Sequence, residues 1–173
     1  MTTTPISTPA SSPAITLIAA NSVTLTPFVR VQQRDRHEDI PACLAILTGK
    51  SIDEVFKSME SSGLPKTGPY HCYITETIIS GVLIKSNLVA TVWKESKSWQ
   101  DVLDVAVVAI DYDDHEDFQT GRCVVFHRVK DASGKQISQC VIDPYPGAAQ
   151  VTTDLKQLTP SWYIGIHKGG KIV

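Results

Sequence analysis

A chain of 173 residues with 42% hydrophobic and 20% charged residues is long enough to bury one core without disulfides or metals. Its formal net charge of -2 excludes a general binder of nucleic acid or of acidic membranes, because both roles need a strongly basic surface. No apolar run approaches the roughly 20 residues that span a bilayer, and the N-terminus lacks the cationic start of a signal peptide.

The first residues differ in composition from the rest of the chain. Residues 1–15 are mostly Thr, Ser and Pro, which predicts a disordered tail. One domain is expected over 16–168, followed by a flexible Gly-Gly tail at 169–173. The alternating apolar and polar residues of 16–31 predict β structure, and Pro27 restricts it to an edge strand or two short pieces.

The next segments predict three helices. The first starts near Asp39, a candidate N-cap, and ends at Gly49, with an apolar stripe at helical spacing. Ser51 and Glu54 form a capping box that predicts the start of a second helix. A third helix is expected over 70–80. The stripe of the first helix consists of Ile40, Cys43, Leu44 and Leu47.

The second half of the chain predicts mainly strands. A continuous apolar run at 105–110 is typical of a central strand, and a short helix is expected over 98–104. Two further segments flank the turn DASGK and predict a hairpin. Helices followed by strands indicate an α+β domain of two lobes. The strands are expected over 88–93, 105–110, 123–129, 137–142 and 161–167.

The four cysteines are scattered and form neither a CxxC pair nor a zinc-like spacing. Each lies in or beside an apolar segment, as reduced and buried thiols do. We therefore expect no metal and no cofactor, and a reducing compartment such as the cytoplasm. The cysteines are Cys43, Cys72, Cys123 and Cys140.

Three separated segments match one family pattern. QRDRHEDIPACLAILTG at 33–49 places a Gln six residues before Asp39, at the start of a helix of small residues. GRCVVF at 121–126 and CVIDP at 140–144 follow later. Together they resemble the papain-like cysteine peptidases that process double-glycine leaders, over 33–146. The resemblance implies a papain-like α+β fold, with an N-terminal helical lobe packed on a mostly antiparallel sheet.

The resemblance also implies site positions, and two of them carry the wrong chemistry. Gln33 matches the oxyanion residue and Asp143 the group that orients a His. Asp39 stands where the nucleophilic Cys belongs, and Arg122 stands where the His belongs. Arg keeps its proton at working pH and cannot act as a general base. We expect a pseudoenzyme that binds a protein or peptide segment, with Asp39, Arg122 and Asp143 in one charge-compensated cluster.

An active enzyme is the alternative. Cys72 in PYHCYI is followed by an aromatic residue, which resembles the active-site entry of viral papain-like leader proteases, with His127 as the base. Self-processing would then occur near Gly169-Gly170. Against this reading, His127 lies five residues after Arg122 and therefore on the opposite face of its strand. A purely structural or assembly role is the third hypothesis.

Two other features are explained most simply without a ligand-binding role. The acidic loop at 111–117 lacks the spacing of an EF-hand and is expected to be a solvated rim, although it could attract a basic peptide. Trp93, Trp99 and Trp162 are expected to pack in the core or at its edge rather than to form a ligand platform.

Overall fold

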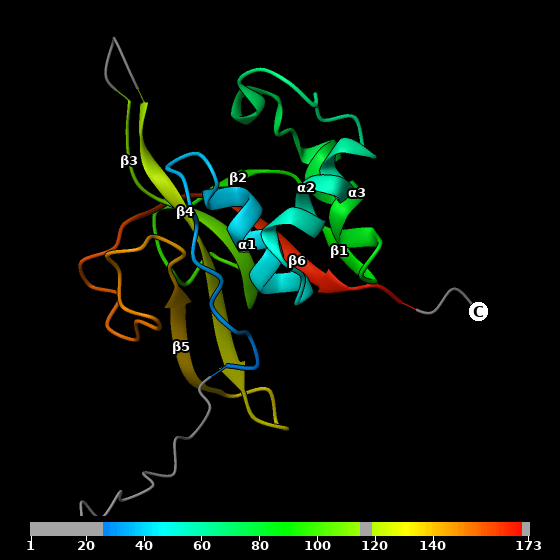
Figure 1. Ribbon diagram of the computed structural model, residues 1–173. Helices are drawn as coiled ribbons and strands as arrows, with labels where there is room; N and C mark the ends of the chain where they lie inside the picture. Colours follow the sequence, from blue (N-terminus) through cyan, green and yellow to red (C-terminus); the bar gives the residue numbers. More distant parts are fainter. Residues whose placement is uncertain (1–25, 115–118, 171–173) are drawn as a thin grey trace, which may run out of the picture.

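The computed structural model describes residues 26–114 and 119–170. The predicted tail at 1–15 therefore lies outside the described residues, as does the end of the Gly-Gly tail at 171–173. Helices gather on one side of a long twisted sheet (Figure 1). They are α1 (Asp39–Thr48), α2 (Ile52–Glu60), the 3₁₀ helix η1 (Tyr70–Tyr73) and α3 (Glu76–Ile84).

The described strands pair antiparallel in the order β1-β6-β3-β4-β5, and β2 also pairs with β6. This arrangement confirms the expected α+β class with a mostly antiparallel sheet. The strands are β1 (Leu88–Ala90), β2 (Lys94–Glu95), β3 (Val105–Asp114), β4 (Gln119–Lys130), β5 (Gln136–Ile142) and β6 (Pro160–Lys168).

The sheet is buried on both faces because its strands alternate between two apolar clusters. On one face, Val107, Val125 and Ile164 pack with the three helices. On the other face, Phe126 stacks on Trp99 at 5.1 Å between ring centroids, and the Trp99 indole donates to the Leu158 carbonyl at 2.9 Å. Trp99 therefore has the packing role that was predicted for it.

Several local predictions are confirmed. Ser51 and Glu54 form the capping box of α2, with both hydrogen bonds present. Gly49 ends α1 with φ at +68°, a conformation that glycine adopts without strain. The hairpin of β4 and β5 is present, and β3 lies at the centre of the sheet. Asp39 differs slightly from expectation, since Glu38 occupies the N-cap position and Asp39 is the first helical residue.

The third helix was predicted wrongly. The chain forms η1, breaks, and then forms α3, which runs through Gly81. A Cβ at Gly81 would lie 2.5 Å from the Ser62 hydroxyl, so this glycine permits close packing of α3 on the end of α2. Close packing, rather than helix termination, explains Gly81.

Three strand and helix predictions also fail. The described part of the predicted strand at 16–31, residues 26–31, forms no strand and is held by side-chain contacts. The strand at 88–93 divides into β1 and β2, and residues 98–104 form turns instead of a helix.

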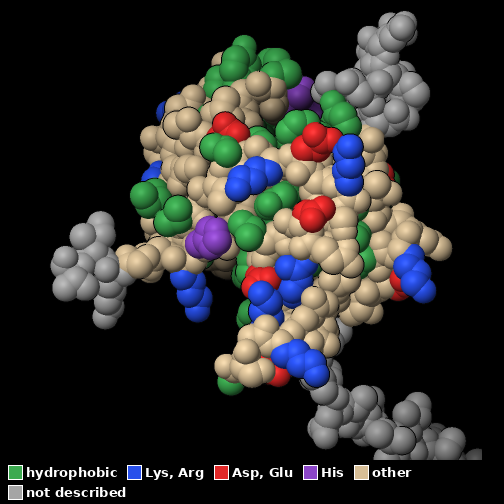
Figure 2. All heavy atoms as spheres, turned by 180° about the vertical axis from the view of Figure 1, so that it is seen from behind, with side chains coloured by type: hydrophobic (Ala, Val, Ile, Leu, Met, Phe, Trp, Pro, Cys, Tyr) green, Lys and Arg blue, Asp and Glu red, His purple; other side chains and the backbone are tan. Residues whose placement is uncertain are grey.

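None of the helices in the described ranges is both long enough and apolar enough to cross a bilayer. The face opposite to that of Figure 1 shows interspersed acidic and basic side chains (Figure 2).

Candidate functional site

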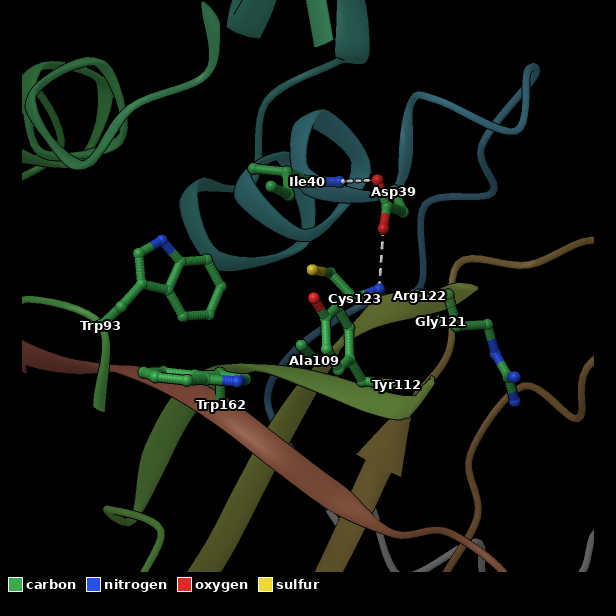
Figure 3. A pocket seen from close by; sticks show the side chains of 9 residues that line it. All are labelled: Asp39, Ile40, Trp93, Ala109, Tyr112, Gly121, Arg122, Cys123 and Trp162. Carbon is green, nitrogen blue, oxygen red and sulfur yellow. Dashed lines mark hydrogen bonds between the residues drawn. The ribbon is translucent and has the colours of Figure 1, made fainter. Parts of the chain in front are cut away.

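Asp39 connects the first helix to the sheet. Its Oδ2 accepts a hydrogen bond from the backbone N–H of Cys123 in β4 at 2.7 Å, and its Oδ1 accepts one from the N–H of Ile40 at 2.9 Å (Figure 3). A carboxylate is also favoured in the first turn of a helix by the macrodipole. The residue at the expected nucleophile position is therefore an acceptor that fastens α1 to β4.

Arg122 is held by two other carboxylates. Its Nε donates to Asp143 Oδ2 at 2.8 Å and its Nη1 donates to Asp111 Oδ2 at 3.1 Å. The guanidinium points away from Asp39 (Figure 3). The expected Arg122–Asp143 pair is thus present, but the third carboxylate is Asp111 rather than Asp39. The prediction that Asp39 joins this charge cluster is wrong.

A β-bulge explains the position of Asp111. The β3–β4 register shifts between Ile110 and Asp113, and Asp111 has φ at +53°, which is unusual for a residue other than glycine. Bulges redirect side chains beside binding sites. Here the bulge accompanies the pairing of Asp111 with Arg122, and the next residue, Tyr112, lines a pocket.

Asp143, the buried member of this cluster, and Gln33, which is buried as well, have further partners. Asp143 Oδ1 accepts from the N–H of Tyr145 at 2.9 Å, and Arg30 Nε donates to the Asp143 carbonyl at 2.6 Å. The Gln33 amide nitrogen donates to the Asp35 carbonyl at 3.0 Å, whereas its Oε1 has no partner among the described residues. In this arrangement one of the two N–H groups of the Gln33 amide is used by the Asp35 carbonyl.

Two pockets adjoin at Asp39 and Arg122. We call the first, of about 600 Å³, the aromatic pocket, and the second, of about 790 Å³, the histidine pocket. We call the two pockets together the groove between α1 and the sheet, where they lie against strands β3, β4 and β6. The pockets share Asp39, Ile40, Gly121 and Arg122; the aromatic pocket adds Trp93, Ala109, Tyr112, Cys123 and Trp162, and the histidine pocket adds Gln33, Arg36, His37, His71, Ile74 and Tyr145.

The alternative Cys–His pair is not joined by a hydrogen bond. Cys72 is exposed on η1, and within the described ranges its thiol bonds to no imidazole. His127 lies in β4, where its Nδ1 is 3.0 Å from Thr26 Oγ1 and its ring meets the edge of Phe28. Burial lowers the pKa of His127 below 6.5, and Asp104 opposes this effect. His127 packs with Thr26 and Phe28 on the face opposite to Arg122.

The buried thiols are poorly reactive because they are held in the protonated form. Cys43 and Cys123 are both buried, and burial raises the pKa of each thiol well above 9.0. The nearby Asp39 carboxylate raises the pKa of both thiols further. Cys43 is therefore a packing residue, as expected. Across residues 26–114 and 119–170, no group of three His, Cys, Asp or Glu side chains is arranged to hold a metal ion.

Sequence reasoning missed the aromatic lining of the first pocket. Trp93 and Trp162 were assigned to packing, but both line this pocket, and Trp162 is 42% exposed. Trp162 lies opposite Ala109 in the register of β3 and β6. The small partner leaves space over the sheet that a larger residue would fill. That pairing is visible only once the strand register is known.

No family model matches the chain, and no curated protein matches it. Several solved chains are similar to it. One is the peptidase domain of Streptococcus ComA, a bifunctional ABC transporter of a quorum-sensing pathway, with 14% identity, a TM-score of 0.49, and 83% of this chain and 99% of that chain covered. Another is a double glycine motif protease from an AMS/PCAT transporter in complex with its leader peptide, with 11% identity, a TM-score of 0.48, and 81% and 91% covered.

Proposed function

We propose that this chain is a catalytically degenerate, papain-like peptidase domain that binds a peptide segment in the groove between α1 and the sheet. The observation that supports the loss of catalysis most directly is the hydrogen bond from the Cys123 amide to Asp39. At the position where the resemblance places a catalytic thiol, this chain has a carboxylate that accepts hydrogen bonds from backbone amides.

The remaining site positions support the same proposal. Thiol catalysis needs a thiolate, a base that accepts its proton and an oxyanion donor. Arg122 is a permanent cation bound by Asp143 and Asp111. The donor nitrogen of Gln33 is bonded to Asp35. The thiolate and the base are therefore missing at these positions, and one of the two N–H groups of the Gln33 amide is committed to Asp35.

The described side chains do not fill the groove. The aromatic and histidine pockets lie on either side of Asp39 and Arg122, which is the arrangement that an extended segment needs to pass between them. Gln33 lines the histidine pocket, and its Oε1 is buried without a hydrogen-bond partner among the described residues. Once the Gln33 side chain turns toward the pocket, an N–H of a bound backbone satisfies this acceptor, whereas an aliphatic ligand leaves it unpaired.

The test is a selection of random peptides on the immobilised full chain. Ile40 lines both pockets, so Ile40→Trp fills the groove where they meet. Ile137→Trp is the matched control, because Ile137 is 66% exposed on β5, away from both pockets. Peptides that bind wild type and the control but not Ile40→Trp support the proposal. Failure to retain any peptide, or equal retention by all three proteins, contradicts it and favours a structural or assembly role.

A further inference from the structure

We infer that the aromatic pocket selects a cationic side chain, lysine or arginine, from the bound segment. The inference deepens the proposed function and rests on it, because it names the residue class that the groove recognises. Three ring systems surround the pocket: Trp93, Tyr112 and Trp162 (Figure 3). Tyr112 is 36% exposed, so its ring is accessible to a ligand. The face of an indole or phenol attracts an ammonium or guanidinium group.

The pocket also holds a carboxylate without a cation. Asp39 lines it, and within 26–114 and 119–170 no Lys, Arg or His forms an ion pair with this carboxylate. Arg122 lines the same pocket, but its charge is already offset by Asp111 and Asp143. The local charge that remains is negative, and a cationic ligand complements it.

Two further carboxylates lie beside the tryptophans. Glu95 is the cross-strand partner of Trp162, so both side chains stand on the same face of the sheet. Glu76 Oε1 accepts a hydrogen bond from the backbone N–H of Trp93 at 2.9 Å. Lys94, the neighbouring basic residue, pairs with Tyr163 and therefore stands on the opposite face. The surroundings of the pocket thus strengthen its negative character.

The other end of the groove differs in charge. The histidine pocket contains Arg36 and the stacked pair of His37 and His71, whose ring centroids are 4.1 Å apart. The Arg36 guanidinium repels a cationic side chain there. The groove therefore orients a bound segment, with its cationic residue at the tryptophans.

An uncharged aliphatic side chain also fits between the rings, but it supplies no opposite charge to the Asp39 carboxylate. Such a side chain would remove water from the Asp39 carboxylate without supplying a partner, which is unfavourable. A lysine ammonium replaces that water with an ion pair and a ring contact. We expect the cationic residue to bind about tenfold more tightly than its neutral isostere.

The experiment is an NMR titration of the full chain that follows the indole N–H signals of its three tryptophans. The probes are N-acetyl-lysine N-methylamide and the neutral N-acetyl-norleucine N-methylamide. The lysine probe should shift the signals of Trp93 and Trp162 in a saturable way and leave Trp99 unchanged, with about tenfold weaker binding of norleucine. Asp39→Asn should abolish the preference, whereas Tyr73→Ala, an exposed aromatic of η1, should retain it.

The outcomes separate this inference from the proposed function. Equal affinity for both probes, or a preference unchanged in Asp39→Asn, overturns the inference even when library peptides bind the groove. Selective lysine binding without any retained library peptide supports the cation site and contradicts the peptide groove. Shifts confined to Trp99 overturn the inference, since that ring lies on the other face of the sheet.

Discussion

The Asp39 carboxylate and the Cys123 amide are joined by a hydrogen bond of 2.7 Å between helix α1 and strand β4. This bond connects the helices to the sheet across the floor of the groove. The chain thereby uses this carboxylate to join the helical layer to the sheet. The same bond brings a negative charge to the pocket between the tryptophans.

Asp39→Ala should lower the free energy of unfolding by about 2 kcal/mol, because a charged acceptor for the Cys123 and Ile40 amides is lost. The melting temperature should fall by about 4 to 8 °C in a chain of this length. Asp39→Asn, which keeps one acceptor oxygen, should lose less. Asp101→Ala is the control, because Asp101 is exposed and its carboxylate takes part in none of the hydrogen bonds of the described residues. Equal melting of Asp39→Ala and wild type would refute this role.

Arg122→Ala should leave the Asp143 carboxylate, whose side chain is 5% exposed, without its cation. We expect a loss of about 2 kcal/mol in the free energy of unfolding, measured by urea denaturation at pH 7. Arg122→Lys should recover only part of this loss, since one ammonium cannot reproduce the two directed contacts to Asp143 and Asp111. An Arg122→Lys variant as stable as wild type would show that the two directed contacts of the guanidinium are unimportant for stability.

Acid should weaken the link between Arg34 and Glu38. Burial raises the pKa of Glu38, but hydrogen bonds from Arg34 outweigh burial and hold this pKa below 4.5. A depressed carboxyl pKa contributes stability above the unfolded value, and this contribution is lost as the pH falls through the folded value. Arg34→Gln should therefore cost roughly 1 kcal/mol at pH 7 and progressively less below pH 4.5.

The measurement for this pair is the urea midpoint from pH 7 to pH 3. Arg36→Gln is the control, because the Arg36 side chain donates no hydrogen bond within the described ranges. The difference between wild type and Arg34→Gln should narrow with acid, while that of the control stays constant. A difference independent of pH would contradict the proposed linkage.

Thiol labelling should identify Cys72 as the one rapidly reacting cysteine. Cys72 is exposed, whereas burial raises the pKa of Cys43, Cys123 and Cys140. A chromogenic disulfide should therefore react quickly with one thiol per native chain, and Cys72→Ala should remove that phase. His127→Ala should leave the rate unchanged, because the His127 imidazole bonds to Thr26 rather than to Cys72. A rate that falls at least tenfold in His127→Ala would revive the Cys72–His127 enzyme.

Local signals made much of the fold predictable. The capping box of Ser51 and Glu54 and the glycine after α1 act within a few residues, so their patterns can be read without tertiary structure. The continuation of α3 through Gly81 was hidden because this glycine serves the packing of two helices and not the end of one. Helix contacts of that kind depend on distant residues.

The candidate site was only partly predictable for the same reason. The Arg122–Asp143 pair follows from two short motifs on neighbouring strands. The contact with Asp111 depends on the bulge in β3, and the aromatic pocket depends on the register that sets Trp162 opposite Ala109. Bulge and register arise from pairing across the sheet, which no single segment specifies.

The most direct test of the proposed function incubates the full chain with a random peptide library in reducing buffer and follows the peptides by mass spectrometry. Our account predicts that a subset of peptides is retained intact, that Ile40→Trp abolishes retention, and that no new peptide termini appear. New termini that disappear in Cys72→Ala would contradict it, because they would show that this domain cleaves the peptides it binds.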